Sequence, residues 1–541
     1  MTHDELWHLP VGLLNLQQAD FHFDRLNPPL TRMWCALPLW ISRTTADSDA
    51  EGSAVGSRFL ELHPENFQQL YFFGRILNII LSVATVLLLA LWAGSVMGET
   101  AAVLTTLMYV SCPNILAHAS IVTPDTGLML GFVATLFQFS RWSRQRSWKN
   151  TLLLAAAIGL TQATKFTAVI LYPVLLTVWF SAAALNRRSQ PSATDTASVR
   201  CAWLQFPVAV AVSLVVLNSV YLWHGSLRPL KSYSFQSTSL QELQALSPAV
   251  SAMPVPLPED YLLGLDQQRA IMEGAHPVFL DGQWSVTGFS DYYPRTLLYK
   301  LSHPVQALLM LGGLLTLFRR TRRLPWCELS LIGIISAVLL GIASTTAMQL
   351  GIRYVLPILP LLMLIAGQIG SLVTPWPKAV QRIAGVIIAA GCLCSLRFHP
   401  HHLAYFNEYA GGPIGGRQHL LDSNIDWGQD LHLVREFMKK HQLQTIRLAY
   451  FGTVPPQMVG IDYTLPPGLT PETRHNFSLP PGYYAVSMNY VMGRPHIIHE
   501  PDGSNRSVGP NEFGYFRTLN PTARLGYSID VYRIGKQGLR P

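Results

Sequence analysis

Residues 76–93 read ILNIILSVATVLLLALWA, an apolar run without a charged side chain. An α-helix rises 1.5 Å per residue, so about 20 apolar residues cross the hydrocarbon core of a bilayer. This run and its flanking residues predict a membrane span over 69–93. Similar runs recur along the chain, which predicts a polytopic α-helical membrane protein.

Composition supports this class. Of 541 residues, 49% are hydrophobic and only 13% are charged. Hydropathy, with breaks at charge clusters and at Gly and Pro, predicts ten spans. They lie at 69–93, 100–121, 124–142, 150–164, 166–185, 203–223, 303–318, 326–346, 353–373 and 382–396. The segment 150–164 is short, so a half-helix is the alternative to a full crossing.

Lys and Arg concentrate in four short loops, at 141–149, 187–200, 319–323 and 378–382. The ten-span topology places all four loops on one side, and the positive-inside rule makes that side cytoplasmic. This bias accounts for the net charge of +8, so we expect no nucleic-acid partner. We therefore expect an integral membrane protein with this orientation.

Three large segments then lie on the extracytoplasmic side, and they define the expected domains. Residues 1–66 form an external loop with an amphipathic helix at Pro29–Ile41, and 67–396 form the membrane domain, which includes a second external loop at 224–302. Residues 397–541 form an external α/β domain. Its strands are predicted at 445–451, 483–489 and 527–534, and its helix at 426–441.

Five isolated charged residues fall on the same outer face: Asp4, Glu5, Asp125, Lys165 and Arg353. A charge at membrane depth is costly and usually functional, so this convergence predicts a site. Two cations, Lys165 and Arg353, face the acids on this outer face. This arrangement resembles a phosphate-binding site beside a base. External residues 224–302 are expected to cover the site as a lid through Trp284, Tyr292, Tyr293 and Arg295.

Each acid also has an alternative structural interpretation. The Asp4-Glu5 pair suits the first turn of a helix, and Thr123-Pro-Asp125 suits a helix start with Thr123 as N-cap. Lys165 would, in the same view, extend its amine to the membrane surface. In the external domain, Asp422, Asp426 and Asp430 recur at intervals of four. This spacing favours helix capping, with a divalent cation as the alternative.

The order of several short motifs resembles a known family. The chain has Asp4-Glu5, then NPPL at 27–30, PNILAH at 113–118 with TPD at 123–125, TKFTA at 164–168, and GIRYVLP at 351–357. The similarity continues through HHLAYFNEYAGGP at 401–413 and DSNIDWGQD at 422–430. Together these motifs resemble the bacterial branch of the protein O-mannosyltransferase and aminoarabinose-transferase superfamily, which are GT-C fold glycosyltransferases of the family 39 type.

The resemblance implies transfer of a hexosyl or pentosyl group from a polyprenyl-phosphate donor to an acceptor hydroxyl on the extracytoplasmic face, with inversion. The acceptor is a protein, a lipid or a glycan. Asp4 would be the base with Glu5 beside it, Asp125 a second acid, and Lys165 and Arg353 the phosphate ligands. Further candidates for the site are His8, His118, Arg75, Asp422 and Asp426. No cofactor is implied beyond the divalent cation already named.

Two further expectations follow. The family has a membrane helix before its acidic pair and eleven spans in all, whereas three residues precede Asp4 here, so we expect a helix upstream of Met1. The alternative function is a polytopic transporter or lipid flippase with an accessory external domain. A transporter is expected to show internal repeats and acids near mid-membrane, and this sequence shows neither pattern.

Overall fold

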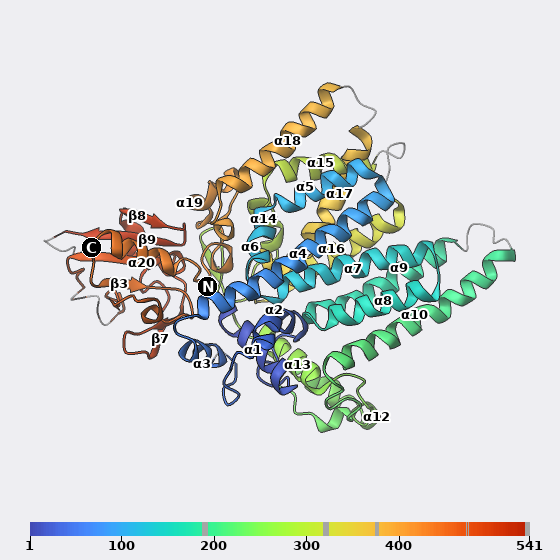
Figure 1. Ribbon diagram of the computed structural model, residues 1–541, viewed down its shortest axis with the longest axis horizontal. Coiled ribbons are helices and arrows are strands. Elements are labelled where there is room, and N and C mark those ends of the chain that lie inside the picture. Colours follow the sequence, from blue (N-terminus) through green and yellow to red (C-terminus); the bar gives the residue numbers. More distant parts are fainter. Residues whose placement is uncertain are drawn as a thin grey trace.

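A computed structural model describes residues 1–52, 54–186, 193–317, 324–373, 378–471, 473, 475 and 477–535. Figure 1 shows a bundle of long helices on one side and a sheet domain, which ends the chain, on the other. The N-terminus lies where the two parts meet. The basic residues predicted at 319–323, together with Arg187 and Arg188, lie outside the described residues.

The N-terminal segment folds into three helices, α1 (Glu5–Gln18), α2 (Leu30–Ile41) and α3 (Ala54–Leu62), and α2 matches the amphipathic stretch that the sequence predicts. A buried ion pair fixes the turn before α2, because Arg32 Nη1 lies 2.7 Å from Asp24 Oδ2. The segment is tied to the bundle by the Tyr71 hydroxyl, which donates a hydrogen bond of 2.5 Å to the carbonyl of Leu6.

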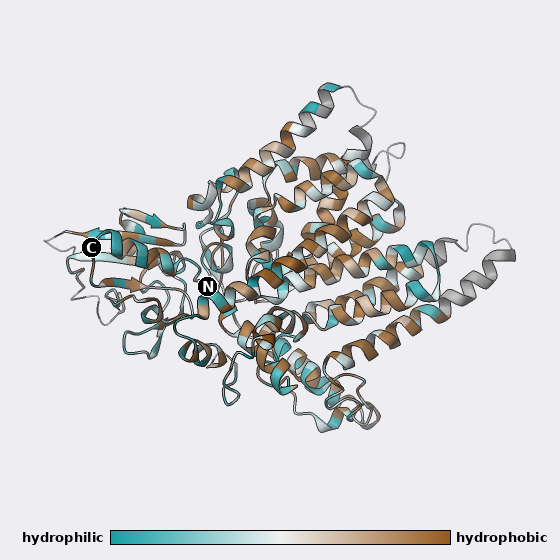
Figure 2. Ribbon diagram, viewed as in Figure 1, coloured by the Kyte–Doolittle hydropathy of each residue, from teal (hydrophilic) through white to brown (hydrophobic). Residues whose placement is uncertain are grey.

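Every segment predicted to span the membrane is largely helical. The helices are α4 (Phe67–Met97), α5 (Glu99–Val110), α6 (Pro113–Ala119), α7 (Pro124–Arg144), α8 (Trp148–Gln162), η1 (Phe166–Ile170), α9 (Leu171–Asn186), α10 (Ala193–Val220), α15 (His303–Leu317), α16 (Trp326–Thr345), η4 (Ile352–Val355), α17 (Ile358–Val373) and α18 (Lys378–Arg397). Hydrophobic residues dominate these helices in Figure 2.

Among the described residues, two helical stretches are long and apolar enough to cross a membrane unaided, Phe67–Met97 and Cys327–Thr345. The pair α5 and α6 passes the same test together but is bent by 65°. The chain is therefore a helical protein with membrane-spanning character. The total of ten spans stays a prediction.

Segment 224–302, which the sequence predicts to be external, folds into short helices and one hairpin. Its elements are η2 (Leu230–Ser232), α11 (Thr238–Ala245), α12 (Pro248–Ser251), α13 (Glu259–Glu273), β1 (Val278–Leu280), β2 (Gln283–Ser285) and α14 (Tyr292–Lys300). Tyr292 and Tyr293 are fully buried, and Arg295 pairs with Asp281 and Asp291 on the surface. These three side chains therefore pack in the interior or pair locally, and the lid role of the segment stays a prediction.

The C-terminal domain contains a five-stranded sheet in the order β4-β3-β5-β9-β8. Its strands are β3 (Ile446–Ala449), β4 (Tyr463–Thr464), β5 (Gly482–Ser487), β8 (Ala523–Leu525) and β9 (Ile529–Ile534). A separate hairpin pairs β6 (His496–His499) with β7 (Asn505–Val508). The sequence predicts β3, β5 and β9, which form the centre of the sheet, where burial makes the apolar pattern strong.

The helix predicted at 426–441 begins later than expected. It is α20 (Leu431–Lys440), and Asp430 occupies its N-cap position without a side-chain cap. Residues Asp422–Asn424 instead form a 3₁₀ turn, η7. Helix capping therefore does not explain why Asp422, Asp426 and Asp430 recur at intervals of four, because their carboxylates have other partners.

Candidate functional site

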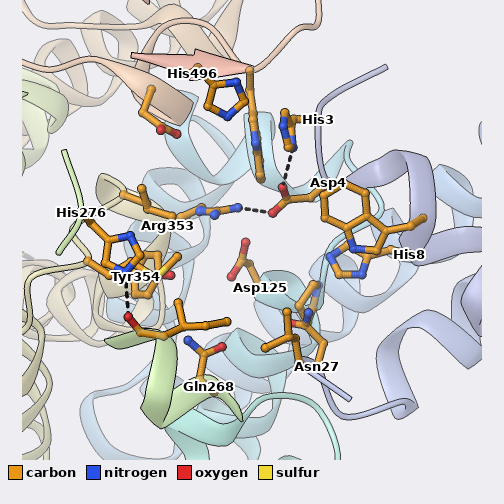
Figure 3. Close-up of a pocket in the computed structure, with 18 of the residues that line it drawn as sticks. His3, Asp4, His8, Asn27, Asp125, Gln268, His276, Arg353, Tyr354 and His496 are labelled. Atoms are coloured by element: carbon orange, nitrogen blue, oxygen red, sulfur yellow. Dashed lines mark hydrogen bonds and ion pairs between the residues drawn. The ribbon is translucent and has the colours of Figure 1, made fainter. Parts of the chain in front are cut away.

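A cavity of about 470 Å³ lies where the N-terminal segment, the membrane helices, the external segment 224–302 and the C-terminal domain meet. Its polar lining comes from all four parts (Figure 3). The polar side chains that line it are His3, Asp4, His8, Asn27, Asp125, Lys165, Gln268, His276, Arg353, Tyr354, Asp422, Arg494 and His496. Four of the five outer-face charges thus share one cavity.

Asp4 lies immediately before α1 and forms an ion pair with Arg353, whose Nη1 is 2.6 Å from Asp4 Oδ2. Asp4 occupies the N-cap position, but its side chain does not cap the helix. Burial raises the pKa of the Asp4 carboxyl, but the Arg353 guanidinium together with His3 and His8 holds that pKa well below its usual value. Asp4 is therefore ionised at neutral pH.

Arg353 lies in the 3₁₀ turn η4. This turn begins directly after Gly351, which has φ +82°. Its guanidinium lies 4.4 Å from the ring centroid of Trp427, a distance typical of a cation–π contact. The Nε atom of Arg353 has no hydrogen-bond partner among the described residues. The guanidinium therefore keeps a donor available to a ligand in the cavity.

Asp125 and Lys165 form a second ion pair, with Lys165 Nζ 2.6 Å from Asp125 Oδ1. Asp125 is in the first turn of α7 after Pro124, as the sequence predicts, although the Thr123 side chain makes no cap. Lys165 lies between α8 and η1 and has an extended backbone conformation. The carboxylate of Asp125 points towards the pair of Asp4 and Arg353 (Figure 3).

Glu5 does not reach the cavity, which differs from the expectation for the acidic pair. Its carboxylate is fully buried and binds Arg75 through two contacts of 2.7 Å. It also accepts hydrogen bonds from the backbone amides of Thr2 and Val122. Burial raises the pKa of Glu5, but Arg75, the N-terminal ammonium and the Thr2 amide together lower it to about 2. Glu5 and Arg75 thus fasten the start of α1 to α4.

The remaining predicted candidates divide between the cavity and the interior. His8 and Asp422 line the cavity, whereas His118 is buried beside Trp427 and outside the lining. Asp426 is also buried outside it, where it accepts hydrogen bonds from the Ser487 hydroxyl and the Gly428 amide. Burial raises the pKa of Asp426 to about 8.

Sequence reasoning missed several lining residues. Gln268 and His276 come from segment 224–302, Arg494 comes from the turn before β6, and His496 is the first residue of β6. The contact of Trp427 with Arg353 is likewise absent from the sequence prediction. None of these residues lies in an apolar run, where a lone charge would have been conspicuous.

An apolar groove of about 190 Å³ adjoins the cavity. The two spaces share Leu26, Lys165, Gln268 and Tyr354. Beyond these, the groove is lined mainly by apolar side chains, which are Phe166, Ile170, Leu265, Met272, Leu339, Ile342 and Ala343. The arrangement suits a ligand with a charged head beside Lys165 and a hydrocarbon tail.

Metal ligands were the alternative for the acids at 422–430. Among the described residues, no group of three or more His, Cys, Asp or Glu side chains is arranged to hold a metal ion. The carboxylates of this stretch are engaged elsewhere: Asp422 pairs with Arg494, and Asp430 accepts a hydrogen bond of 2.6 Å from the Ser528 hydroxyl.

Comparison with solved structures found two kinds of similar protein. The crystal structure of ArnT from Cupriavidus metallidurans in the apo state aligns over 98% of this chain and 94% of its own, with 13% identity and a TM-score of 0.48. The archaeal oligosaccharyltransferase AglB from Archaeoglobus fulgidus, in complex with an inhibitory peptide and a dolichol-phosphate, aligns over 97% and 72%, with 12% identity and a TM-score of 0.43.

Comparison with curated protein sequences found no significant match. A family model, described as dolichyl-phosphate-mannose-protein mannosyltransferase, matches residues 59–219. The matched segment includes Asp125 and Lys165, the second ion pair of the cavity. Residues 59–219 therefore carry the sequence signature of this mannosyltransferase family, as the motifs of the chain predict.

Proposed function

We propose that the protein transfers a sugar from a polyprenyl-phosphate donor to an acceptor hydroxyl in the cavity. One observation carries the proposal most strongly. Two acid–cation pairs, Asp4 with Arg353 and Asp125 with Lys165, line a single cavity that adjoins an apolar groove. A lipid-linked sugar phosphate needs both a cationic site for its phosphate and an apolar path for its chain.

Lys165 and Arg353 bind the donor phosphate. Lys165 is shared by the cavity and the groove, so a phosphate beside it places the first prenyl units against Phe166 and Leu265. Arg353 completes the phosphate site, since its planar guanidinium suits phosphate oxygens and its Nε is free of other described partners. The charge that develops on the leaving phosphate is then held by two cations.

Asp4 is the general base. The acceptor oxygen forms a bond to the anomeric carbon while its proton passes to Asp4, and the bond from the anomeric carbon to the phosphate oxygen breaks. That electron pair leaves with the lipid phosphate. Inversion at the anomeric carbon is the stereochemistry that the family resemblance implies.

Because Asp4 pairs with Arg353, donor binding precedes proton transfer to Asp4. Before the donor binds, Arg353 stabilises the charged carboxylate and makes Asp4 a weak base. A bound phosphate competes for the same guanidinium, so the pKa of Asp4 rises towards the range useful for proton transfer. Asp125 keeps Lys165 in place beside the phosphate.

The finer assignments belong to the same proposal. The site and the C-terminal domain lie on the extracytoplasmic side of a bacterial inner membrane, and the acceptor is a protein, lipid or glycan hydroxyl. Glu5 and Arg75 act on the site only by holding the segment that carries Asp4. A transporter or flippase role is the alternative, but charges gathered at one mouth support transfer chemistry better than passage through the membrane.

The deciding experiment follows radiolabelled sugar from a panel of undecaprenyl-phosphate sugars in membranes that contain the full-length protein. Label that appears in protein, lipid or glycan fractions, and that disappears with Asp4→Asn, supports the proposal. Movement of the intact labelled donor between leaflets without transfer supports the flippase alternative. A parallel assay with chelator determines whether transfer needs a divalent cation.

A further inference from the structure

The cavity holds a third acid–cation pair, Asp422 with Arg494, which lies in the C-terminal domain. Resting on the proposed function, we infer that Asp422 and Arg494 form the subsite that recognises the hydroxyl groups of the donor sugar, and that this sugar is uncharged. Donor selection would then be a task of the C-terminal domain as well as of the membrane helices.

The pair is a built site with spare hydrogen-bonding capacity. Arg494 Nη2 lies 2.5 Å from Asp422 Oδ2, and both residues are 8% exposed. The Nε atom of Arg494 has no hydrogen-bond partner among the described residues, and its Nη1 reaches only the Pro277 carbonyl, at 3.4 Å. A buried donor without a partner is costly, and a ligand hydroxyl in the cavity would satisfy it.

The Asp422 carboxylate is also able to accept further hydrogen bonds. Asp422 Oδ1 receives one hydrogen bond, of 2.5 Å from the Ser423 amide, and each carboxylate oxygen can accept two. A sugar hydroxyl is both donor and acceptor, so an acid beside an arginine can bind neighbouring hydroxyls of one ring. Phe451 and Trp427 line the same cavity and offer aromatic surface to the C–H groups of the ring.

The pair is held in a fixed geometry. Asn489 ties the segment that carries Arg494 to the segment that carries Asp422. Its Oδ1 accepts a hydrogen bond of 2.8 Å from the Asp422 amide, and its Nδ2 donates one of 3.0 Å to the Asp426 carbonyl. Asp422 has φ +60°, a conformation that costs energy for a residue other than glycine. The surrounding contacts maintain this conformation and aim the carboxylate, as a preorganised site requires.

Position in the cavity assigns the pair to the sugar. The groove meets the cavity at Lys165 and Tyr354, so a donor phosphate there sends its prenyl chain into the groove. The sugar must then extend away from the groove. Asp422 and Arg494 line the cavity but not the groove, and Asp422 acts electrostatically on Arg353, the second phosphate ligand.

Charge balance defines the class of sugar. Asp422 and Arg494 neutralise each other, whereas Lys165 and Arg353 of the other two pairs face the donor phosphate. A carboxylate or amine on the sugar would have to disrupt a buried ion pair to find a partner, and breaking such a pair is costly. The subsite therefore favours a neutral hexosyl or pentosyl ring.

The test compares two lipids on the purified full-length protein: undecaprenyl phosphate, and the same lipid bearing a neutral hexose. Asp422→Asn and Arg494→Gln should each weaken binding of the glycosylated lipid about tenfold, as expected for the loss of a charged hydrogen bond. Binding of the sugar-free lipid should stay within about twofold. Arg417→Gln is the matched control, since Arg417 pairs with Asp530 at 2.7 Å outside the cavity.

Two further arms separate a local role from misfolding. Arg494→Lys keeps the positive charge but loses the planar guanidinium, so it should weaken binding of the glycosylated lipid less than Arg494→Gln does. Asp422→Asn leaves Arg494 unpaired, so the variant should gain affinity for a donor whose sugar carries a carboxylate. Wild-type preference for that charged donor over the neutral one would overturn the inference.

The remaining outcomes are equally decisive. Equal weakening of both lipids would assign the pair to the phosphate, and a change confined to the acceptor KM would assign it to the acceptor; both results refute the sugar subsite. If the wild type binds neither lipid, the proposed function itself fails. If the wild type prefers the glycosylated lipid and the variants keep that preference, only the subsite fails.

Discussion

The carboxylate of Asp4 lies 2.6 Å from the guanidinium of Arg353, although 349 positions separate them in the chain. The contact joins the N-terminal segment to the turn before α17, and Trp427 of the C-terminal domain lies against the same guanidinium. Three parts of the chain thus meet at one ion pair.

Asp4→Asn should lower the rate of sugar transfer by about 10²- to 10⁴-fold, the usual contribution of a positioned general base. Donor affinity should be retained, because Arg353 loses a competing carboxylate. Turnover and donor binding of the purified protein measure the two effects. Asp20→Asn, a change outside the cavity in the same segment, should leave both values unchanged; normal turnover of Asp4→Asn would remove Asp4 from the reaction.

Arg353→Ala should raise the KM for the donor by about tenfold or more and change the KM for the acceptor little, because a guanidinium–phosphate contact is lost. Steady-state kinetics with each substrate varied in turn separate the two constants. A parallel rise of both KM values would contradict the assignment of Arg353 to the phosphate.

Glu5→Gln should lower stability by about 1–3 kcal/mol, because it leaves Arg75 without its anion in a partly exposed position. The folded-state pKa of Glu5, about 2, lies below its usual value, so this stabilisation is present above about pH 4.5 and is lost as pH falls through 2. Thermal unfolding at neutral pH measures the loss.

The double variant of Glu5→Gln with Arg75→Gln should recover part of this stability, since neither charge is then unpaired. Its transfer rate should recover with it. A transfer defect that persists at full stability would mean that Glu5 acts in the chemistry after all.

Asp426→Asn should make stability less dependent on pH. Burial raises the pKa of Asp426 to about 8 in the folded protein, above its value of 3.8 when exposed. The folded state therefore binds the extra proton, and stability falls as pH rises from about 4 to about 8. We expect the variant to unfold about 2–4 °C higher than the wild type at pH 8, with no difference at pH 4; an equal shift at both values would refute the titration of Asp426.

Gly351→Ala should reduce both transfer and stability. A Cβ at Gly351 would lie 2.3 Å from the Asn424 side chain, and φ +82° is unfavourable for alanine. The displaced turn carries Arg353, so donor affinity should fall with the transition temperature. Gly333→Ala is the matched control, because its Cβ would meet open space in α16; equal behaviour of the two variants would contradict this steric argument.

Local patterns predicted much of the fold. Apolar runs located the helices of the membrane domain, because a helix that faces lipid must be apolar over its own length. The central strands β3, β5 and β9 were predicted for a similar reason. The short strands β4 and β8 and the hairpin of β6 and β7 were missed, since a few half-buried residues give little periodicity.

The candidate site was predicted unevenly. Asp125, Lys165 and Arg353 stand out because each is a lone charge beside apolar residues, and the structure brings them together with Asp4. Glu5 is adjacent to Asp4 in sequence but turns into the interior, because successive side chains of a helix point in different directions. Arg494 lies in a polar segment, where a further charge carries no signal.

The sequence by itself determined the membrane-spanning character of the helices and the residue types available for chemistry, since both follow from the polarity of each side chain in its own segment. Only the tertiary structure decided which acid meets which cation. Ion pairs such as Asp4 with Arg353, or Asp422 with Arg494, depend on distances of a few ångströms between segments far apart in the chain. Those distances result from the packing of the whole molecule, which no local pattern encodes.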